Sequence, residues 1–76
     1  MTEATLLHRF GINLTDMLDY CNTTKKELAE LTGISEATIS RYTKGLIMPS
    51  LKNLINIAYE LDCTVDELID LTERID

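Results

Sequence analysis

A group of short or hydrogen-bonding side chains follows Ser35 and falls on one face of a predicted helix. Its members are Glu36, Ala37, Ser40, Arg41 and Lys44. They lie one, two, five, six and nine residues after Ser35, and at 3.6 residues per turn this spacing gathers them on one side. An α-helix fits the major groove of duplex DNA, where base edges are read by hydrogen bonds. The face therefore predicts a surface that could contact DNA.

Two short helices and a tight turn must hold this face in position. Thr24 caps the first helix, and Glu27 stands at the position that completes a capping box. Gly33 suits the left-handed conformation that ends a helix, and Ser35 caps the helix that follows. The apolar residues expected to close a small core between the two helices are Leu28, Ile34, Ile39 and Tyr42. The segment 24–44 is thus predicted to be a helix, a turn and a second helix that Gly45 closes.

Three further segments have the apolar periodicity of helices. The residues Leu14, Met17, Leu18 and Cys21 recur at helical spacing and predict a helix from Asn13 to about Asn22. Ser50 caps a helix after Pro49, and its predicted inner face is Leu51, Leu54, Ile55, Ala58 and Leu61. Thr64 and Glu67 cap a short fifth helix with Val65, Leu68 and Ile69 on its inner side. Since no stretch alternates with period two, we expect an all-α, compact five-helix domain.

The domain is expected to span residues 13–72. Residues 1–12 are assigned to an N-terminal extension, in which Leu6, Leu7 and Phe10 could form a short helical turn, and residues 73–76 to a C-terminal tail. Leu71 and Ile75 point away from the predicted inner side of the fifth helix. They are therefore candidates for a two-fold dimer contact, the alternative being that they lie on a frayed tail.

Charge is distributed unevenly along the 76 residues, whose net charge is −6. The balance runs −2 for residues 1–22, +2 for 23–53 and −6 for 54–76, so only the middle third suits a polyanion. No apolar run reaches the roughly 18 residues of a membrane span, and the first twenty residues lack the core of a signal peptide. These features predict a soluble cytoplasmic domain with no membrane contact.

Residues that could carry catalysis or bind a metal are few. His8 is the only histidine, and Cys21 and Cys63 lack the spacing of metal ligands. No nucleophile stands beside a base in the pattern of a hydrolase. The chain is therefore expected to have no catalytic residue, metal or cofactor, and not to be an enzyme.

From Thr24 to Leu68 the sequence resembles the phage-repressor and Cro-like (XRE-type) helix-turn-helix family. The motifs ELAELTGIS, ATISRY, PSL and VDEL carry the resemblance. The resemblance implies that residues 36–44 form a recognition helix in the major groove of a DNA operator. The implied base-reading residues are Glu36, Ala37, Ser40 and Arg41. The implied phosphate contacts are Thr24, Lys25, Ser35, Thr38, Lys44, Ser50 and Lys52.

Some residues depart from the family pattern. Glu36 could accept a hydrogen bond from a cytosine amino group, or it could only favour the start of its helix. The loop Leu46-Ile47-Met48 is apolar, whereas relatives usually carry lysine or arginine there. It could fold against the next helix or contact another protein. Leu18 and Thr43 replace an Arg–Glu pair that the family often has between its first and third helices.

The sequence is compatible with two functions. The first is a small prokaryotic or phage transcriptional regulator, repressor-like, that binds double-stranded DNA as a homodimer. The alternative is a protein-interaction module, antitoxin-like or an anti-repressor, that keeps the fold without strong DNA binding, because fold alone does not determine function.

Overall fold

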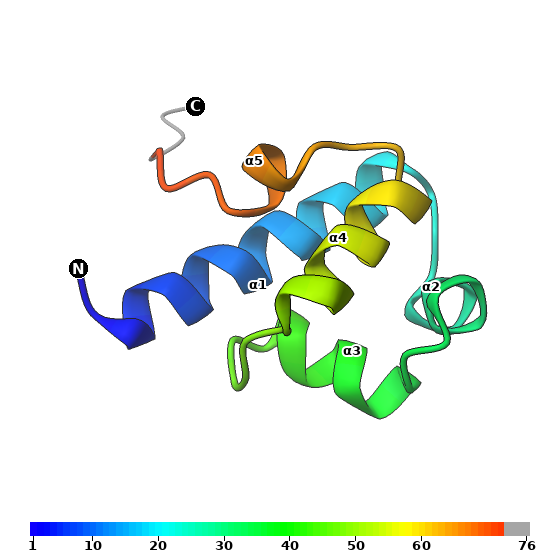
Figure 1. The fold of residues 1–76 in the computed structure, drawn as a ribbon, viewed down its shortest axis with the longest axis horizontal. Helices are drawn as coiled ribbons and strands as arrows, with labels where there is room; N and C mark the ends of the chain where they lie inside the picture. The colour runs from blue at the N-terminus through cyan, green and yellow to red at the C-terminus, as the bar shows by residue number, and fades with distance from the viewer. Residues whose placement is uncertain (73–76) are drawn as a thin grey trace.

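The computed structural model describes residues 1–72 of the chain, and five helices account for most of them. The helices are α1 (Glu3–Tyr20), α2 (Lys25–Thr32), α3 (Glu36–Thr43), α4 (Leu51–Glu60) and α5 (Val65–Leu68). The long α1 runs through the middle of the molecule, with α3 on one side and α5 on the other (Figure 1). Residues 1–72 contain no strand, so the predicted all-α, five-helix fold is confirmed.

One apolar core joins the five helices. Its buried members are Phe10, Leu14, Leu18, Leu28, Ile34, Ile39, Tyr42, Ile57, Ala58, Leu61 and Leu68. Within this core α3 packs against α1 and α2, while α4 packs against α2 and α5. Each fully buried leucine or isoleucine contributes roughly 1.5–3 kcal/mol through its removal from water.

The first helix begins ten residues before the position that the sequence predicted. Thr2 caps α1 by accepting a hydrogen bond from the Thr5 amide at 3.2 Å, and Phe10 is only 1% exposed within the core. The predicted start at Asn13 is therefore wrong, because residues 3–12 form the first half of α1. The predicted tail, residues 73–76, lies outside the described residues.

Gly11 lies where α1 comes closest to α3. A Cβ atom at this position would lie 2.8 Å from the Thr43 carbonyl oxygen and 2.9 Å from the Tyr42 carbonyl oxygen. Both neighbours are backbone atoms, which cannot move aside as a flexible side chain can. The glycine therefore permits the helix contact and does not break α1.

The ends of α1, α3 and α4 share one turn geometry. A residue with positive φ follows each helix, namely Asn22 (52°), Gly45 (70°) and Asp62 (52°). The accompanying hydrogen bonds join Thr23 N to Leu18 O, Leu46 N to Arg41 O and Cys63 N to Ala58 O, at 2.9, 3.0 and 2.9 Å. This pattern is the Schellman motif, in which glycine, asparagine or aspartate tolerates the left-handed backbone.

The predicted starts of the other four helices, α2 to α5, agree with the structure. Thr24 and Thr64 both form capping boxes, with Glu27 and Glu67 as the respective partners. The connections before α2, α3 and α5 each consist of a left-handed residue, then a spacer, then a cap. Because these signals are local, they could be read directly from the sequence.

Several apolar side chains lie elsewhere than predicted. The residues expected inside but found exposed are Leu51, Ile55 and Ile69. Ile57, which the predicted inner face of α4 omitted, is fully buried instead. The inner side of α4 is therefore rotated relative to the prediction.

Asn13 is a buried polar residue whose role the sequence did not reveal. Its Nδ2 donates to the Leu68 carbonyl oxygen at 3.0 Å and to the Asp70 carbonyl oxygen at 2.9 Å. These two bonds use both amide protons and hold the end of α5 against α1. The exposed Leu71 follows directly after them, while Ile75 lies outside the described residues.

Replacing Gly11 with alanine tests the contact between α1 and α3. Helix propensity alone would make Gly11→Ala stabilising by about 1 kcal/mol. We expect the opposite, a loss of about 1–3 kcal/mol in the free energy of unfolding, because the added methyl overlaps backbone atoms of α3. Urea unfolding followed by circular dichroism measures the difference. Gly33→Ala is the control for strain without overlap, since no atom lies within 4 Å of its added Cβ. A stabilised Gly11→Ala variant would contradict the close approach.

Candidate nucleic-acid interface

The orientation of α3 is set by two buried side chains, Ile39 and Tyr42. The ring of Tyr42 meets the ring of Phe10 edge to face, with centroids 5.8 Å apart and an interplanar angle of 69°. The hydroxyl of Tyr42 accepts a hydrogen bond from Asn53 Nδ2 at 3.2 Å. Since Phe10 lies on α1 and Asn53 on α4, α3 is held from both neighbours and turns its opposite side to solvent.

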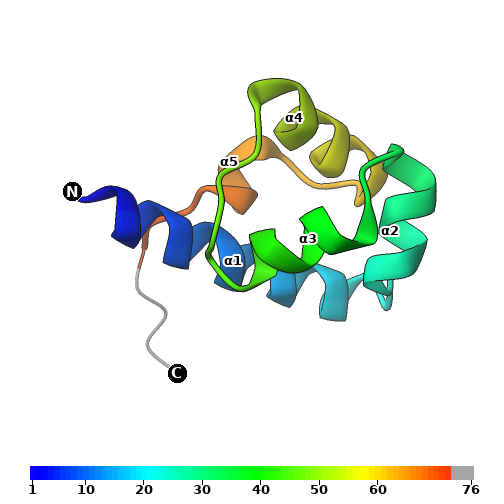
Figure 2. The ribbon, with the colours of Figure 1, turned by 90° about the horizontal axis from the view of Figure 1, so that it is seen from below.

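The predicted base-reading residues lie together on the outer side of α3. Glu36, Ala37 and Arg41 are exposed, and Ser40 is half-buried. Lys44, the C-cap residue, is also exposed at the end of the same side. Figure 2 looks onto this part of the molecule and shows α3 lying across its near side. The helix is therefore accessible to a large ligand along its length.

The turn between α2 and α3 is braced by hydrogen bonds. Gly33 has a φ of 76°, and its amide donates to the Ala29 carbonyl oxygen at 2.9 Å. The Ile34 amide donates to Thr32 Oγ1 at 3.2 Å. From α4, Asn56 Nδ2 donates to the Thr32 carbonyl oxygen at 2.9 Å. The angle between α2 and α3 is consequently set by α4 as well as by the turn.

Hydroxyl groups cap the three helices where phosphate contacts were predicted. Thr24, Ser35 and Ser50 each accept a hydrogen bond from the amide three residues later, at 3.1 Å. Capping uses a lone pair, so the hydroxyl proton remains available for an acceptor. At α3 this proton is already used, because Ser35 Oγ donates to Thr38 Oγ1 at 2.7 Å. There Thr38 carries the available hydroxyl proton.

The cations around α3 have no counter-charge of their own. Within residues 1–72, the side chains of Lys25, Arg41, Lys44 and Lys52 form no ion pair and no hydrogen bond. The first amides of α2 and α4 also point outward without helical acceptors, as at any helix start. Glu36 is the acidic residue in the first turn of α3, where its charge complements the helix dipole. The outer face thus combines unpaired cations with one carboxylate at its N-terminal end.

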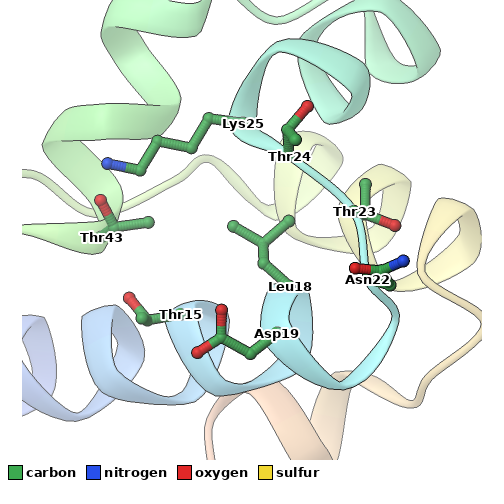
Figure 3. Close-up of a pocket in the computed structure, with 8 residues that line it drawn as sticks. All are labelled: Thr15, Leu18, Asp19, Asn22, Thr23, Thr24, Lys25 and Thr43. Carbon is green, nitrogen blue, oxygen red and sulfur yellow. The ribbon is translucent and has the colours of Figure 1, made fainter.

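A pocket of about 340 Å³ lies where the end of α1, the start of α2 and the end of α3 meet. Leu18 and Thr43 both line it, so the two positions expected to replace an Arg–Glu pair are brought together. Figure 3 shows Lys25 reaching across the pocket toward Thr43, with Asp19 and Thr15 on the α1 side. Lys25 therefore lies between α2 and α3 and does not project directly away from the molecule.

Two apolar surfaces lie outside the α3 face. The loop residues Leu46, Ile47 and Met48 are exposed, so the loop is not buried against α4. Leu51, Ile55 and Tyr59 are exposed along α4, and the sequence analysis missed this row. The available signal was a second apolar series at four-residue spacing, distinct from the buried series Leu54, Ile57 and Leu61.

Residues 1–72 contain no group of three or more His, Cys, Asp or Glu side chains that could hold a metal ion. None of their helices combines the length and apolarity needed to cross a membrane. Cys21 and Cys63 are unpaired thiols, and both are half-buried. Burial raises the pKa of the Cys63 thiol, and the nearby Glu67 raises it further.

The arrangement of α2, α3 and the turn defines a helix-turn-helix domain. A helix-turn-helix family model matches residues 21–68 of this chain. The match covers most of the chain, and the chain belongs to this helix-turn-helix family. The motifs that carried the XRE-type resemblance lie within the matched residues.

Two curated proteins are similar to the chain over part of its length. The chain is 36% identical over 47 residues to the cryptic phage CTXphi transcriptional repressor RstR of Vibrio cholerae, covering 62% of this chain and 42% of that protein. It is 46% identical over 46 residues to the replication factor C small subunit of Methanocaldococcus jannaschii, covering 60% of this chain and 2% of that protein. The chain therefore spans less than half the length of either relative.

The raised pKa of Cys63 makes stability depend on pH. The unfolded chain loses the thiol proton at a lower pH than the folded protein does. The free energy of unfolding should therefore be unaffected at neutral pH and fall as pH rises through the alkaline range in which the thiol ionises. Urea unfolding at a series of pH values measures this fall, which Cys63→Ser should reduce. Cys21→Ser is the control and should retain most of the fall, because Cys21 raises the pKa of Cys63 less than burial and Glu67 do. Identical pH profiles for Cys63→Ser and the unmodified protein would contradict the assignment.

Proposed function

We propose that the chain binds duplex DNA through the outer side of α3 and acts as a small, repressor-like transcriptional regulator. The observation that carries the proposal is the single exposed face of α3, held by Ile39 and Tyr42 within a helix-turn-helix domain. An α-helix inserted in the major groove can present such a face to base edges. The similarity to a phage transcriptional repressor supports the same function.

Arg41 is the residue proposed to read a base. Its side chain is exposed and unpaired within residues 1–72. A guanidinium can donate two parallel hydrogen bonds to guanine, a contact worth roughly 1–3 kcal/mol of discrimination. Ala37 and Ser40 lie beside it and are small enough to allow the backbone close to the groove. Lys44, one turn farther on, is proposed to contact phosphate.

Few of the residues proposed to contact phosphate carry a positive charge. The proposed set is Thr24, Lys25, Ser35, Thr38, Lys44, Ser50 and Lys52. Only the three lysines in this set are cationic. Each neutralised phosphate makes the slope of log affinity against log salt more negative by about 0.9, so the three lysines give a slope of roughly −3. Because the whole chain carries −6, we infer that a single copy binds DNA weakly at physiological salt.

Weak binding by one copy favours a homodimer on a palindromic operator. Two recognition helices placed about 34 Å apart would then enter successive major grooves on one side of the duplex. Leu71, an exposed residue beyond α5, and Ile75 are the dimer contacts proposed from the sequence. We place this regulator in the cytoplasm, where its DNA would be found.

A protein-interaction module is the second candidate function. It is favoured by the exposed apolar loop Leu46–Met48 and by the net charge of −6. An antitoxin-like or anti-repressor role would use this loop as a contact for another protein. In that case the outer side of α3 would bind no DNA sequence selectively.

Selection of bound sequences from a random duplex library at low salt distinguishes the two functions. A regulator should enrich a defined motif, and Arg41→Ala should relax the preference at one base pair and lower affinity about tenfold. Lys44→Ala, the control, should weaken binding to all sequences alike and reduce the salt slope by about 1. No enrichment of any motif, or equal losses on every sequence for Arg41→Ala, would contradict base reading by α3.

Glu36→Gln tests the carboxylate at the start of α3. Removing a negative charge near phosphates should strengthen binding to every sequence, and most strongly at low salt. If Glu36 accepts a hydrogen bond from a cytosine, the variant should also lose preference at one base pair. Affinity measured on the selected duplex and on a variant at each position separates the two effects. Unchanged affinity for every duplex would show that the carboxylate of Glu36 neither contacts a base nor is repelled by the phosphates.

A further inference from the structure

The outer side of α4 carries an unpartnered apolar row. Leu51, Ile55 and Tyr59 recur every four residues and are 70%, 52% and 81% exposed. The opposite side of the same helix holds Ile57 and Ala58, which are buried in the core. We call these three exposed residues the α4 stripe.

The α4 stripe has no function in the fold or on the proposed DNA face. Single exposed apolar side chains are common on proteins, whereas an aligned set marks an interaction surface. Residues four apart on a helix are neighbours and form a continuous ridge. Here the ridge runs along the whole of α4, from Leu51 at its first residue to Tyr59 one residue before its end. A surface of this shape fits another helix.

The charges beside the stripe indicate which helix would fit. Lys52 is exposed at the start of α4, and Asp62 is exposed just after its end. The helix dipole has the same polarity, positive at the start and negative at the end. A second α4 in antiparallel orientation would place Lys52 of each copy near Asp62 of the other. A parallel copy would instead place lysine near lysine.

We propose that the α4 stripe is the surface on which a second copy of this chain packs, with the two α4 helices antiparallel. A two-fold contact uses the same patch on both copies, so Ile55, at the centre of the stripe, meets Ile55 of the partner. Leu51 then faces Tyr59 of the partner at each end. This contact differs from the one proposed for Leu71 and Ile75, and it does not depend on DNA binding.

The dimer should be weak in isolation. Three apolar side chains from each copy form a contact at or below the low end of specific interfaces, which begins at about 1,200 Å². We expect a dissociation constant on the order of 10–100 μM for such a dimer.

Sedimentation equilibrium of the full chain without DNA, from about 10 μM to 1 mM, tests the proposal. The unmodified protein should pass from monomer to dimer over this range. Ile55→Asp, which opposes two carboxylates at the two-fold axis, should weaken the dimer by more than tenfold. Leu31→Asp, at an exposed leucine of α2 outside both proposed contacts, is the matched control and should leave the dimer unchanged. Leu71→Asp distinguishes the α4 contact from the C-terminal one. Thermal unfolding of each variant verifies that it is folded.

A protein that stays monomeric up to about 1 mM would overturn the proposal, and its stripe would belong to a different partner. A dimer lost in Leu71→Asp but kept in Ile55→Asp would also overturn it, in favour of the C-terminal contact. Because no DNA is present, either result is independent of whether α3 reads bases.

The orientation of the two helices has its own test. Lys52→Gln removes an attraction in an antiparallel pair and should weaken the dimer several-fold at low salt. In a parallel pair the same change removes a repulsion. A strengthened or unaltered dimer would therefore overturn the antiparallel arrangement. Affinity for a single operator half-site, measured in parallel, separates any loss of the Lys52 phosphate contact from the loss of pairing.

Discussion

The contact between α1 and the end of α3 is the constraint on which the outer face depends. At Gly11 the two backbones approach so closely that a Cβ atom would lie 2.8 Å from a carbonyl oxygen. One residue earlier, Phe10 meets the ring of Tyr42 edge to face. These neighbouring contacts determine how far α3 lies from α1 and which way it is rotated. If α3 rotated by one residue, about 100°, Tyr42 would leave the core and the exposed face would lose Arg41.

The second support of α3 comes from α4. Asn53 donates to the hydroxyl of Tyr42, and Asn56 donates to the carbonyl oxygen of Thr32. One helix turn of α4 thus holds both the last turn of α3 and the last residue of α2. Replacing either asparagine would leave a partly buried acceptor without its donor, which usually costs about 1–3 kcal/mol. The inner side of α4 therefore positions the helix-turn-helix, while its outer side remains available for other contacts.

Local signals in the sequence predicted the helix caps, the turn glycine and the face of α3. A capping box or a left-handed glycine depends on residues within four positions of each other, so tertiary packing does not need to be known. The start of α1 and the inner side of α4 depend instead on distant partners. The role of Gly11 has no local signal, because the carbonyl groups that it approaches, those of Tyr42 and Thr43, are more than thirty residues away in the chain. Leu51 and Ile55 fit the spacing of an inner face as well as Ile57 does, and only packing against α2 and α5 selects between the two series.

The charge balance connects the two proposals. The four unpaired cations around α3 belong to a chain whose net charge is −6, so the electrostatic attraction of one copy to DNA is expected to be weak at physiological salt. Two copies joined through α4 would bind the second half-site as an intramolecular step, with an effective concentration in the millimolar range for a short connection. Such a dimer needs no strong contact of its own, because the duplex and the α4 pair each stabilise the other by mass action. Under this arrangement, affinity for an operator would rise steeply with protein concentration, since both copies must be recruited together.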